Sequence, residues 1–231
     1  RADLAAQEIR RLRRALDCWV TNNRTMAESA EFKRAVVDFY QRREVTDPAT
    51  DRIISARCMI SGGVHKYDDL CPAHLVKHCK PELMTLYDLP QDDIDSPRNG
   101  ILILKELELA FDHKTVCFLR NPMTGALVLR VLDPSLVGKR IHPSSTSEIR
   151  TFGDINGCEL QHPAGNLPFR RILSMHAKLS LSRALHSGWI KNEEEIDMYY
   201  NISESGLEEP ECLRALTWKE INYAEIEAVI V

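Results

Sequence analysis

The apolar positions of the N-terminal part recur with helical spacing. Over residues 2–20 they stand three or four apart, at Ala5, Ile9, Leu12, Leu16 and Trp19, which is the period of an amphipathic helix. Thr25 and Glu28 have the spacing of a capping box, so a second helix is expected from about 26 to 43. Its apolar side carries Met26, Ala30, Val36, Val37 and Tyr40. We expect the two helices to form a hairpin that ends at Thr46-Asp47-Pro48.

Short apolar segments separated by turn residues follow, and they predict short strands and one helix. A weakly patterned segment at 52–60 precedes the turn residues Ser61-Gly62-Gly63, and a short apolar segment runs from Leu70 to Val76. The interval 80–98 is rich in proline and aspartate, so we expect a polar insertion with one helical turn around 82–87. Asn99-Gly100 predicts a tight turn. An apolar run at 101–104 and a helix at 105–112 are expected after it.

The C-terminal half predicts a β-hairpin and one long helix. The hairpin is expected from the strand-like segments 116–119 and 127–132, which a segment containing Pro122 and Gly125 joins. Residues 133–166 are rich in loop residues. A helix is expected from Pro168 to His186, since proline suits a first helical turn and Gly188 suits a helix end. Its apolar side would include His176 as a packed, hydrogen-bonded residue.

These elements predict an α+β fold in three parts. The parts are a helical hairpin at 1–48, a central domain at 49–190 and an acidic extension at 191–231. A chain of 231 residues that is 44% hydrophobic and 28% charged has the composition of an ordinary globular protein. The sequence does not begin with Met, so we expect it to be a piece of a longer protein.

The charge is distributed unevenly along the chain. The net charge of −4 is not that of a typical nucleic-acid-binding protein. However, residues 1–44 carry ten basic and seven acidic side chains, and residues 191–231 carry three basic and eleven acidic ones. The weakly positive body therefore leaves room for phosphate contacts. The arginines of the first helix would form either a solvated face or a phosphate-facing patch.

The cysteines indicate the cellular compartment. There are seven of them, without any CxxC pair, and the chain starts without a signal-peptide pattern. Reduced thiols and an intracellular location, in either nucleus or cytoplasm, are therefore expected. No apolar run reaches the roughly 18 residues that a transmembrane helix requires.

Polar residues recur beside the apolar segments of the central stretch. In order, the segments are Cys58-Met-Ile-Ser-Gly62, Ala73-His-Leu-Val76, Asn99-Gly-Ile-Leu-Ile103 and Glu108-Leu-Ala-Phe-Asp112. Polar side chains within such segments need partners when they are buried. The ordered set resembles the HNH endonuclease family, in the branch with Ala-His and Asn-Gly motifs. The resemblance covers residues 57 to about 132 and extends to Leu173 and His176 if the later helix is included.

The resemblance implies a fold and a mechanism. The family core has two antiparallel strands and a helix around one divalent metal ion. His74 matches the general base that activates water for attack on a phosphodiester, and a neutral imidazole can accept that proton near neutral pH. Asn99 matches the residue that would position the His74 ring or the loop between strand and helix. The alternative is that Asn99 is an ordinary turn residue.

The sequence departs from the family at the helix. The family places His where this chain has Glu108, four residues before Asp112 and on the same helix face. Two carboxylates would favour Mg²⁺ or Mn²⁺ over Zn²⁺. Asp68, Asp69 and His113 are further candidates for the ligand that would complete the site. The replacement could equally mean reduced or lost cleavage, and the alternative for both acids is an ordinary solvated helix face.

A second reading of the same region is a structural zinc site. Cys71, His74, His78 and Cys79 have ligand-like spacing, and Cys58 lies upstream. A zinc ion bound to His74 would prevent this residue from acting as a base. Zinc thus remains a possible cofactor beside the favoured Mg²⁺ or Mn²⁺.

Two functions therefore stand at this point. The first is a metal-dependent HNH-type endonuclease that hydrolyses nucleic acid, with DNA favoured over RNA by the family resemblance. Its phosphate contacts would come from Arg98, Lys105, Lys114 and the first helix, and they would be sensitive to salt. The second is an HNH scaffold with impaired catalysis that binds nucleic acid or a protein. In either case the N-terminal helices could contact a protein partner or a second copy.

Overall fold

A computed structural model describes residues 26–78, 81–121, 123–141 and 150–191. The predicted helix at 2–20, the hairpin that it would form and the acidic extension beyond residue 191 lie outside these ranges. The first described element is helix α2, Met26–Phe39, whose buried side chains Phe32, Val36 and Val37 follow the helical period. None of the helices in the described ranges has the length and apolar composition that a membrane crossing requires.

A three-stranded antiparallel sheet follows α2 where the sequence predicted the end of a helix. The strands are β1 (Arg43–Thr46), β2 (Ile53–Arg57) and β3 (Val64–Lys66), in the order β1-β2-β3. The prediction of a helix to residue 43 was wrong by four residues, and the strand β1 was missed. Asp47 explains the turn between β1 and β2, because its carboxylate accepts hydrogen bonds from Ala49 N and Thr50 Oγ1.

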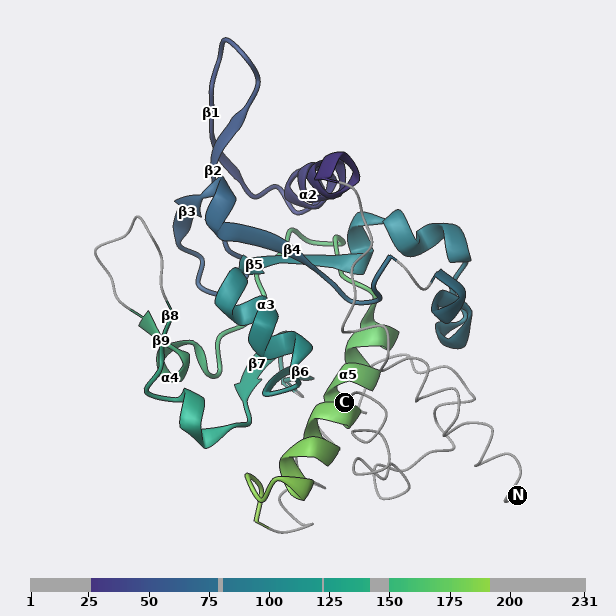
Figure 1. The fold of residues 1–231 in the computed structure, drawn as a ribbon, viewed down its shortest axis with the longest axis vertical. Coiled ribbons are helices and arrows are strands. Elements are labelled where there is room, and N and C mark those ends of the chain that lie inside the picture. Colours follow the sequence, from purple (N-terminus) through teal and green to yellow (C-terminus); the bar gives the residue numbers. More distant parts are fainter. Residues whose placement is uncertain (1–25, 79–80, 122, 142–149, 192–231) are drawn as a thin grey trace.

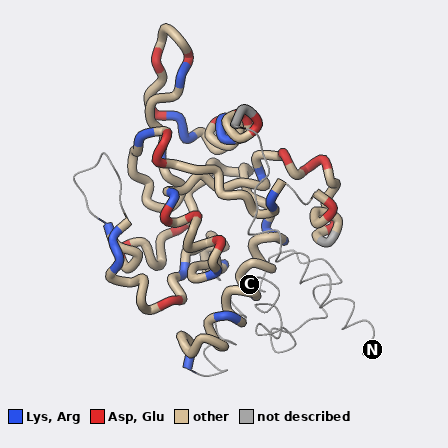
Figure 2. The backbone as a smooth tube through the Cα atoms, in the orientation of Figure 1, with Lys and Arg blue, Asp and Glu red and all other residues tan. Residues whose placement is uncertain are grey.

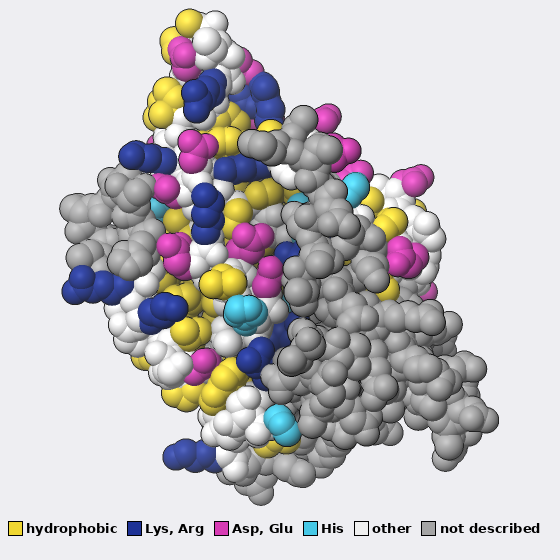
Figure 3. All heavy atoms as spheres, viewed as in Figure 1, with side chains coloured by type: hydrophobic (Ala, Val, Ile, Leu, Met, Phe, Trp, Pro, Cys, Tyr) yellow, Lys and Arg dark blue, Asp and Glu magenta, His cyan; other side chains and the backbone are white. Residues whose placement is uncertain are grey.

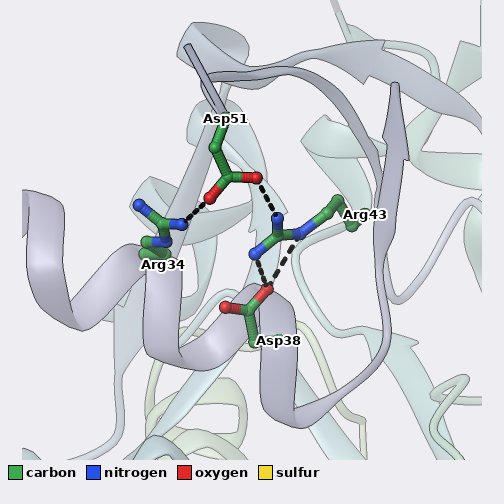
Figure 4. Close-up of polar contacts among 4 residues, drawn as sticks. All are labelled: Arg34, Asp38, Arg43 and Asp51. Atoms are coloured by element: carbon green, nitrogen blue, oxygen red, sulfur yellow. Dashed lines mark hydrogen bonds and ion pairs between the residues drawn. The ribbon is translucent and has the colours of Figure 1, made fainter. Parts of the chain in front are cut away.

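An ionic network ties the β1–β2 hairpin to α2. Arg43 donates to Asp38 of the helix and to Asp51 of the turn, and Asp51 also pairs with Arg34 (Figure 4). In Figure 1 the hairpin projects from the body of the molecule beside α2. The network therefore holds a projecting element whose own apolar contacts are few, since Val45 and Ile54 are about half exposed.

Two strands and a helix form the centre of the molecule. Strand β4 (Leu70–His74) pairs antiparallel with β5 (Gly100–Leu104), from Leu70 opposite Leu104 to His74 opposite Gly100. Helix α3, Lys105–Asp112, begins directly after β5 and contacts both strands (Figure 1). Every residue of β5 is buried because α2 packs on this strand pair as well as α3. The helix predicted at 105–112 is confirmed.

The turn predicted at Asn99-Gly100 is wrong. Gly100 has the extended conformation φ −139° and ψ 153° and begins β5, while Asn99 closes the short 3-10 helix η4, Pro97–Asn99. Glycine is required here by space. A Cβ atom at Gly100 would lie 2.9 Å from Phe32 Cζ and 2.9 Å from Val36 Cγ2 of α2. Gly100 thus permits the close approach of α2 to the strand pair.

An acidic arm connects β4 to β5. It consists of the 3-10 helices η2 (Pro81–Tyr87) and η3 (Gln91–Asp95), so the helical turn predicted near 82–87 is present. Figure 2 shows acidic residues, in red, at several positions along this arm. They are Glu82, Asp88, Asp92, Asp93 and Asp95. The arm is anchored by buried Leu83, Met84 and Ile94, so it is a packed part of the domain rather than an open loop.

The C-terminal part covers the other side of α3. The predicted hairpin is present as β6 (Val116–Arg120) and β7 (Leu127–Val131), and the predicted helix is present as α5 (Arg170–His186). Strand β6 is buried on both faces, because Phe118 enters the main core while Cys117 and Leu119 face α5. Between β7 and α5 lie η5 (Pro134–Leu136), β8 (Arg140–Ile141), β9 (Arg150–Thr151) and α4 (Phe152–Ile155).

Candidate functional site

Asn99 fastens the end of β4 to the start of β5. Its side chain is completely buried, and its amide accepts a hydrogen bond from Val76 N at 2.9 Å. The same amide donates to Val76 O at 2.8 Å and to Ile94 O at 2.9 Å. Since an amide offers one acceptor and two donors, Asn99 binds the strand end and the acidic arm at once. It positions the backbone that follows His74, which is more than a turn residue would do.

His74 lies at the end of β4, under helix α2. The residue is 3% exposed, and its ring stacks on Phe32 with centroids 4.1 Å apart and an interplanar angle of 16°. The partner of His74 across the strand pair is Gly100, next to Asn99. The strand register and Asn99 therefore fix the backbone on both sides of this imidazole, and the Phe32 ring fixes its plane.

Asp112, at the end of α3, forms an ion pair with Lys77. Lys77 Nζ lies 2.8 Å from Oδ2 and 3.1 Å from Oδ1 of Asp112, and the two side chains are 6% and 20% exposed. Burial raises the pKa of Asp112, and the Lys77 ammonium opposes that rise. Lys77 directly follows Val76, whose backbone is hydrogen-bonded to Asn99. The backbone position of Lys77 is therefore fixed, and this positions its ammonium group.

Lys114 is a second buried lysine next to Asp112, and it contacts the main chain of that residue. The residue is 3% exposed, has the left-handed backbone angle φ +55° and donates to Asp112 O at 3.3 Å. Burial lowers the pKa of Lys114 to about 7, and the Asp112 charge counters this in part. The position is thus inside the protein, whereas the sequence analysis placed Lys114 among the phosphate contacts.

Glu108 lies one helical turn before Asp112 and next to Cys71 of β4. It is half-buried. Burial raises the pKa of the Cys71 thiol, and the negative charge and hydrogen bond of Glu108 raise it further. The thiol also donates to Ile103 O at 3.5 Å. The Cys71 thiol is therefore protonated and acts as a hydrogen-bond donor.

These residues do not fit a divalent metal site. Both Asp112 oxygens already bind an ammonium group, and the described residues contain no group of three His, Cys, Asp or Glu side chains that could hold an ion. Of the residues in the zinc hypothesis, Cys71 donates to Ile103 O, His74 stacks on Phe32, and His78 lies 3.6 Å from Asp95. Cys79, a further residue of that hypothesis, lies outside the described ranges.

Arg98 and Lys105 remain as candidate phosphate contacts. Arg98 is exposed, donates through Nε to Leu167 O at 3.0 Å and covers the Phe169 ring at 4.7 Å. Lys105 is exposed at the start of α3. On the face seen in Figure 3, basic and acidic side chains of the described residues alternate without forming one broad basic patch. Both contacts stay predictions, and modest affinity would follow from so few cations.

Helix α5 supports the end of α3 that carries Asp112. His176 stacks on Phe111 with centroids 3.7 Å apart and donates through Nε2 to Phe111 O at 2.8 Å. Arg183 donates to His113 O at 2.6 Å. The prediction that His176 is a packed, hydrogen-bonded residue is confirmed. Burial holds the pKa of His176 well below its ordinary value, so the ring is neutral near pH 7.

Lys77 is the site residue that sequence reasoning missed. The pairing with Asp112 spans 35 positions, so no local spacing indicates it. The one available signal was a lysine directly after the apolar segment Leu70–Val76, where a charged side chain within a buried interval requires a partner.

Comparison with known proteins identifies the central stretch. Residues 58–119 match the model of a family described as HNH endonuclease. This interval runs from the residue after β2 to the fourth residue of β6, and it contains His74, Asn99, Glu108 and Asp112. A search of curated proteins and a search of solved structures returned no match.

Proposed function

From the premise that residues 58–119 form an HNH endonuclease domain, we propose that this chain hydrolyses phosphodiester bonds in nucleic acid, with His74 as the general base. The observation that supports the proposal is the fixed end of β4. His74 is held between Phe32 and the Asn99-bound strand end, inside the family-matched interval. A side chain held in this way can take a proton from a water molecule without first losing rotamer freedom.

The acid–base part of the reaction needs only the residues at the strand end. A neutral imidazole accepts the proton of the attacking water, and the resulting imidazolium can return it to solvent after the bond is cleaved. Asn99 is a positioning residue, because it touches Val76 and Ile94 and not the reacting atoms. DNA is the proposed substrate over RNA because the family resemblance favours it.

A second function is favoured by the ion pair at Asp112. A carboxylate whose two oxygens bind Lys77 is not available to a metal ion, and the family histidine is replaced by Glu108. If cleavage requires the metal, the domain would bind nucleic acid without cutting it. The same scaffold would then recognise backbone phosphate as an interaction module.

A cleavage assay separates these functions. Supercoiled plasmid DNA and a structured RNA of similar length are incubated with the protein in EDTA, in Mg²⁺ and in Mn²⁺. The variants are His74→Ala, His74→Gln and, as a matched control, His186→Ala, which removes an exposed histidine at the end of α5. Thermal unfolding of each variant checks that the loss of the Phe32 stack leaves the domain folded.

The nuclease proposal predicts that the parent cleaves DNA in at least one buffer. Both His74 variants should lose about 10²-fold or more, which is the usual contribution of a general base, while His186→Ala keeps the parent rate. Cleavage that persists in both His74 variants would remove His74 from the reaction. Nucleic-acid binding without cleavage in any buffer would establish the second function instead.

A further inference from the structure

The Asp112 carboxylate at the end of α3 has a cationic partner without any bound ion. Glu108 and Asp112 lie one turn apart on the helix. The Lys77 ammonium binds the Asp112 carboxylate, and Lys114 Nζ donates to the Asp112 main-chain carbonyl. Asp112 is also in the last turn of α3, where the helix dipole disfavours negative charge. A positive charge beside the Asp112 carboxylate is therefore favourable, and Lys77 supplies it.

Lys77 is held in place by the same contacts that hold His74. Asn99 binds both the N–H and the C=O of Val76, the residue before Lys77, and His74 lies three residues upstream. The Lys77 side chain is 6% exposed, so it is packed along its length and not free to swing through solvent. Imidazole and ammonium therefore come from one strand end, which the amide of Asn99 holds from η4.

An ammonium group can serve two partners. It has three N–H donors and no acceptor. Asp112 accepts two of these donors, at 2.8 Å and 3.1 Å, and the third is the one that a phosphate oxygen would reach through the small exposed part of the side chain. Lysine binds phosphate as a point charge, without the fixed geometry that a divalent ion requires of its ligands.

We propose that the Lys77 ammonium occupies the place of a divalent cation at the end of α3 and supplies the positive charge that a backbone phosphate of nucleic acid meets there. The phosphate part of this inference rests on the proposed function, whereas the exclusion of a metal ion from Asp112 does not. The protein alone would then supply the positive charge of the site, without a bound metal ion. The affinity of the site for nucleic acid would not depend on divalent ions.

The first test measures Mn²⁺ binding by isothermal titration and by the loss of the free-ion EPR signal. The proteins are the wild type, Lys77→Met and Lys77→Met combined with Asp112→Asn. Removing the ammonium leaves Glu108 and Asp112 facing each other, so Lys77→Met should bind Mn²⁺ at least about tenfold more tightly than the wild type. The added Asp112→Asn change should abolish that gain. A wild type that binds one Mn²⁺ as tightly as Lys77→Met would overturn the proposal.

The second test measures the binding of a labelled DNA oligonucleotide in EDTA and in Mg²⁺. The wild type should bind equally in both, and Lys77→Met should bind about tenfold more weakly, as expected when a charged hydrogen bond to phosphate is lost. Lys77→Arg keeps the charge and should retain most of the affinity. Lys139→Met, which removes an exposed lysine after η5, is the control for a general change in charge.

The two tests fail in different ways. Binding that requires Mg²⁺, or an affinity of Lys77→Met equal to that of Lys139→Met, would contradict the role of Lys77 toward phosphate. A wild type that neither binds nor cuts nucleic acid would defeat the proposed function and the phosphate role together. The Mn²⁺ titration would then still decide whether Lys77 excludes an ion from Asp112. Thermal unfolding of each variant shows that the compared proteins are folded.

Discussion

Two ionic clusters in this protein have similar contacts between basic and acidic side chains, but they differ in their exposure to solvent. The network of Arg34, Asp38, Arg43 and Asp51 ties the β1–β2 hairpin to α2, and its side chains are 30–61% exposed (Figure 4). The pair of Lys77 and Asp112 is 6% and 20% exposed. Water can replace any partner in the first cluster but not in the second.

The difference in exposure between the two clusters decides how much each contributes to stability. Exposed pairs contribute little because solvation and screening compensate for their loss. A desolvated pair is different, because removal of one partner leaves the other charge buried. The Lys77–Asp112 pair should thus tolerate joint replacement better than single replacement, and the surface network should tolerate both.

The largest expected effect comes from breaking the buried pair on one side. Asp112→Ala leaves the buried Lys77 ammonium group without its carboxylate partner. We expect the free energy of unfolding to fall by about 3 kcal/mol, the lower end of the cost of breaking a buried ion pair. Urea denaturation followed by circular dichroism measures it. A loss no larger than that of a surface substitution would show that water reaches the pair.

The next effect is a pH dependence of stability that arises from the buried His176. The pKa of His176 is lowered in the folded protein, so below pH 6.5 the unfolded chain takes up a proton that the folded protein does not. Stability should therefore fall with decreasing pH, by up to about 1.4 kcal/mol per pH unit from this residue. His176→Gln should remove this part of the slope. Unfolding free energies at pH 5, 6 and 7 check it, and parallel slopes for parent and variant would contradict it.

A smaller effect is expected when both partners of the buried pair are replaced together. Lys77→Met with Asp112→Leu removes the charges and keeps similar volumes. Its stability should lie within about 1 kcal/mol of the parent, because apolar replacement of a buried pair is often neutral. Combined with the two single variants, it completes a double-mutant cycle. A double variant as unstable as the sum of the single ones would mean that the two side chains do not interact.

The smallest effect is expected in the surface network. Asp51→Ala removes the partner that Arg34 and Arg43 share, and we expect a loss of about 0.5 kcal/mol or less. This loss should shrink further in 1 M salt, where the Debye length is about 3 Å. Thermal unfolding in low and high salt measures both. A loss above about 2 kcal/mol that persists in high salt would contradict the contrast between the clusters.

Much of the fold could be predicted because its elements carry strong local patterns. Helix α3, the β6–β7 hairpin and helix α5 lie where apolar periodicity placed them. Strand β1 could not be predicted, since Arg43–Thr46 is only partly buried and lacks a clear alternation. Gly100 was misread because Asn-Gly is usually a turn, whereas here the close approach of α2 requires glycine.

The sequence motifs proposed the residues of the candidate site, whose roles stay predictions, but they did not indicate the partners of these residues. Motif order gave His74, Asn99, Glu108 and Asp112, and the family match covers all four. Lys77 was not predictable, because an ion pair between residues 35 positions apart depends on the tertiary fold. Lys114 was expected at the surface because lysine is rarely buried, yet α5 and the end of α3 enclose it.

We propose that an ammonium group stands at the end of α3 where an HNH site would hold a metal ion. Crystals soaked in MnCl₂ and measured at the manganese absorption edge test it most directly. The account predicts that Lys77 Nζ stays on Asp112 and that no anomalous peak appears between Glu108 and Asp112. A manganese ion bound to both carboxylates, with Lys77 displaced, would contradict it.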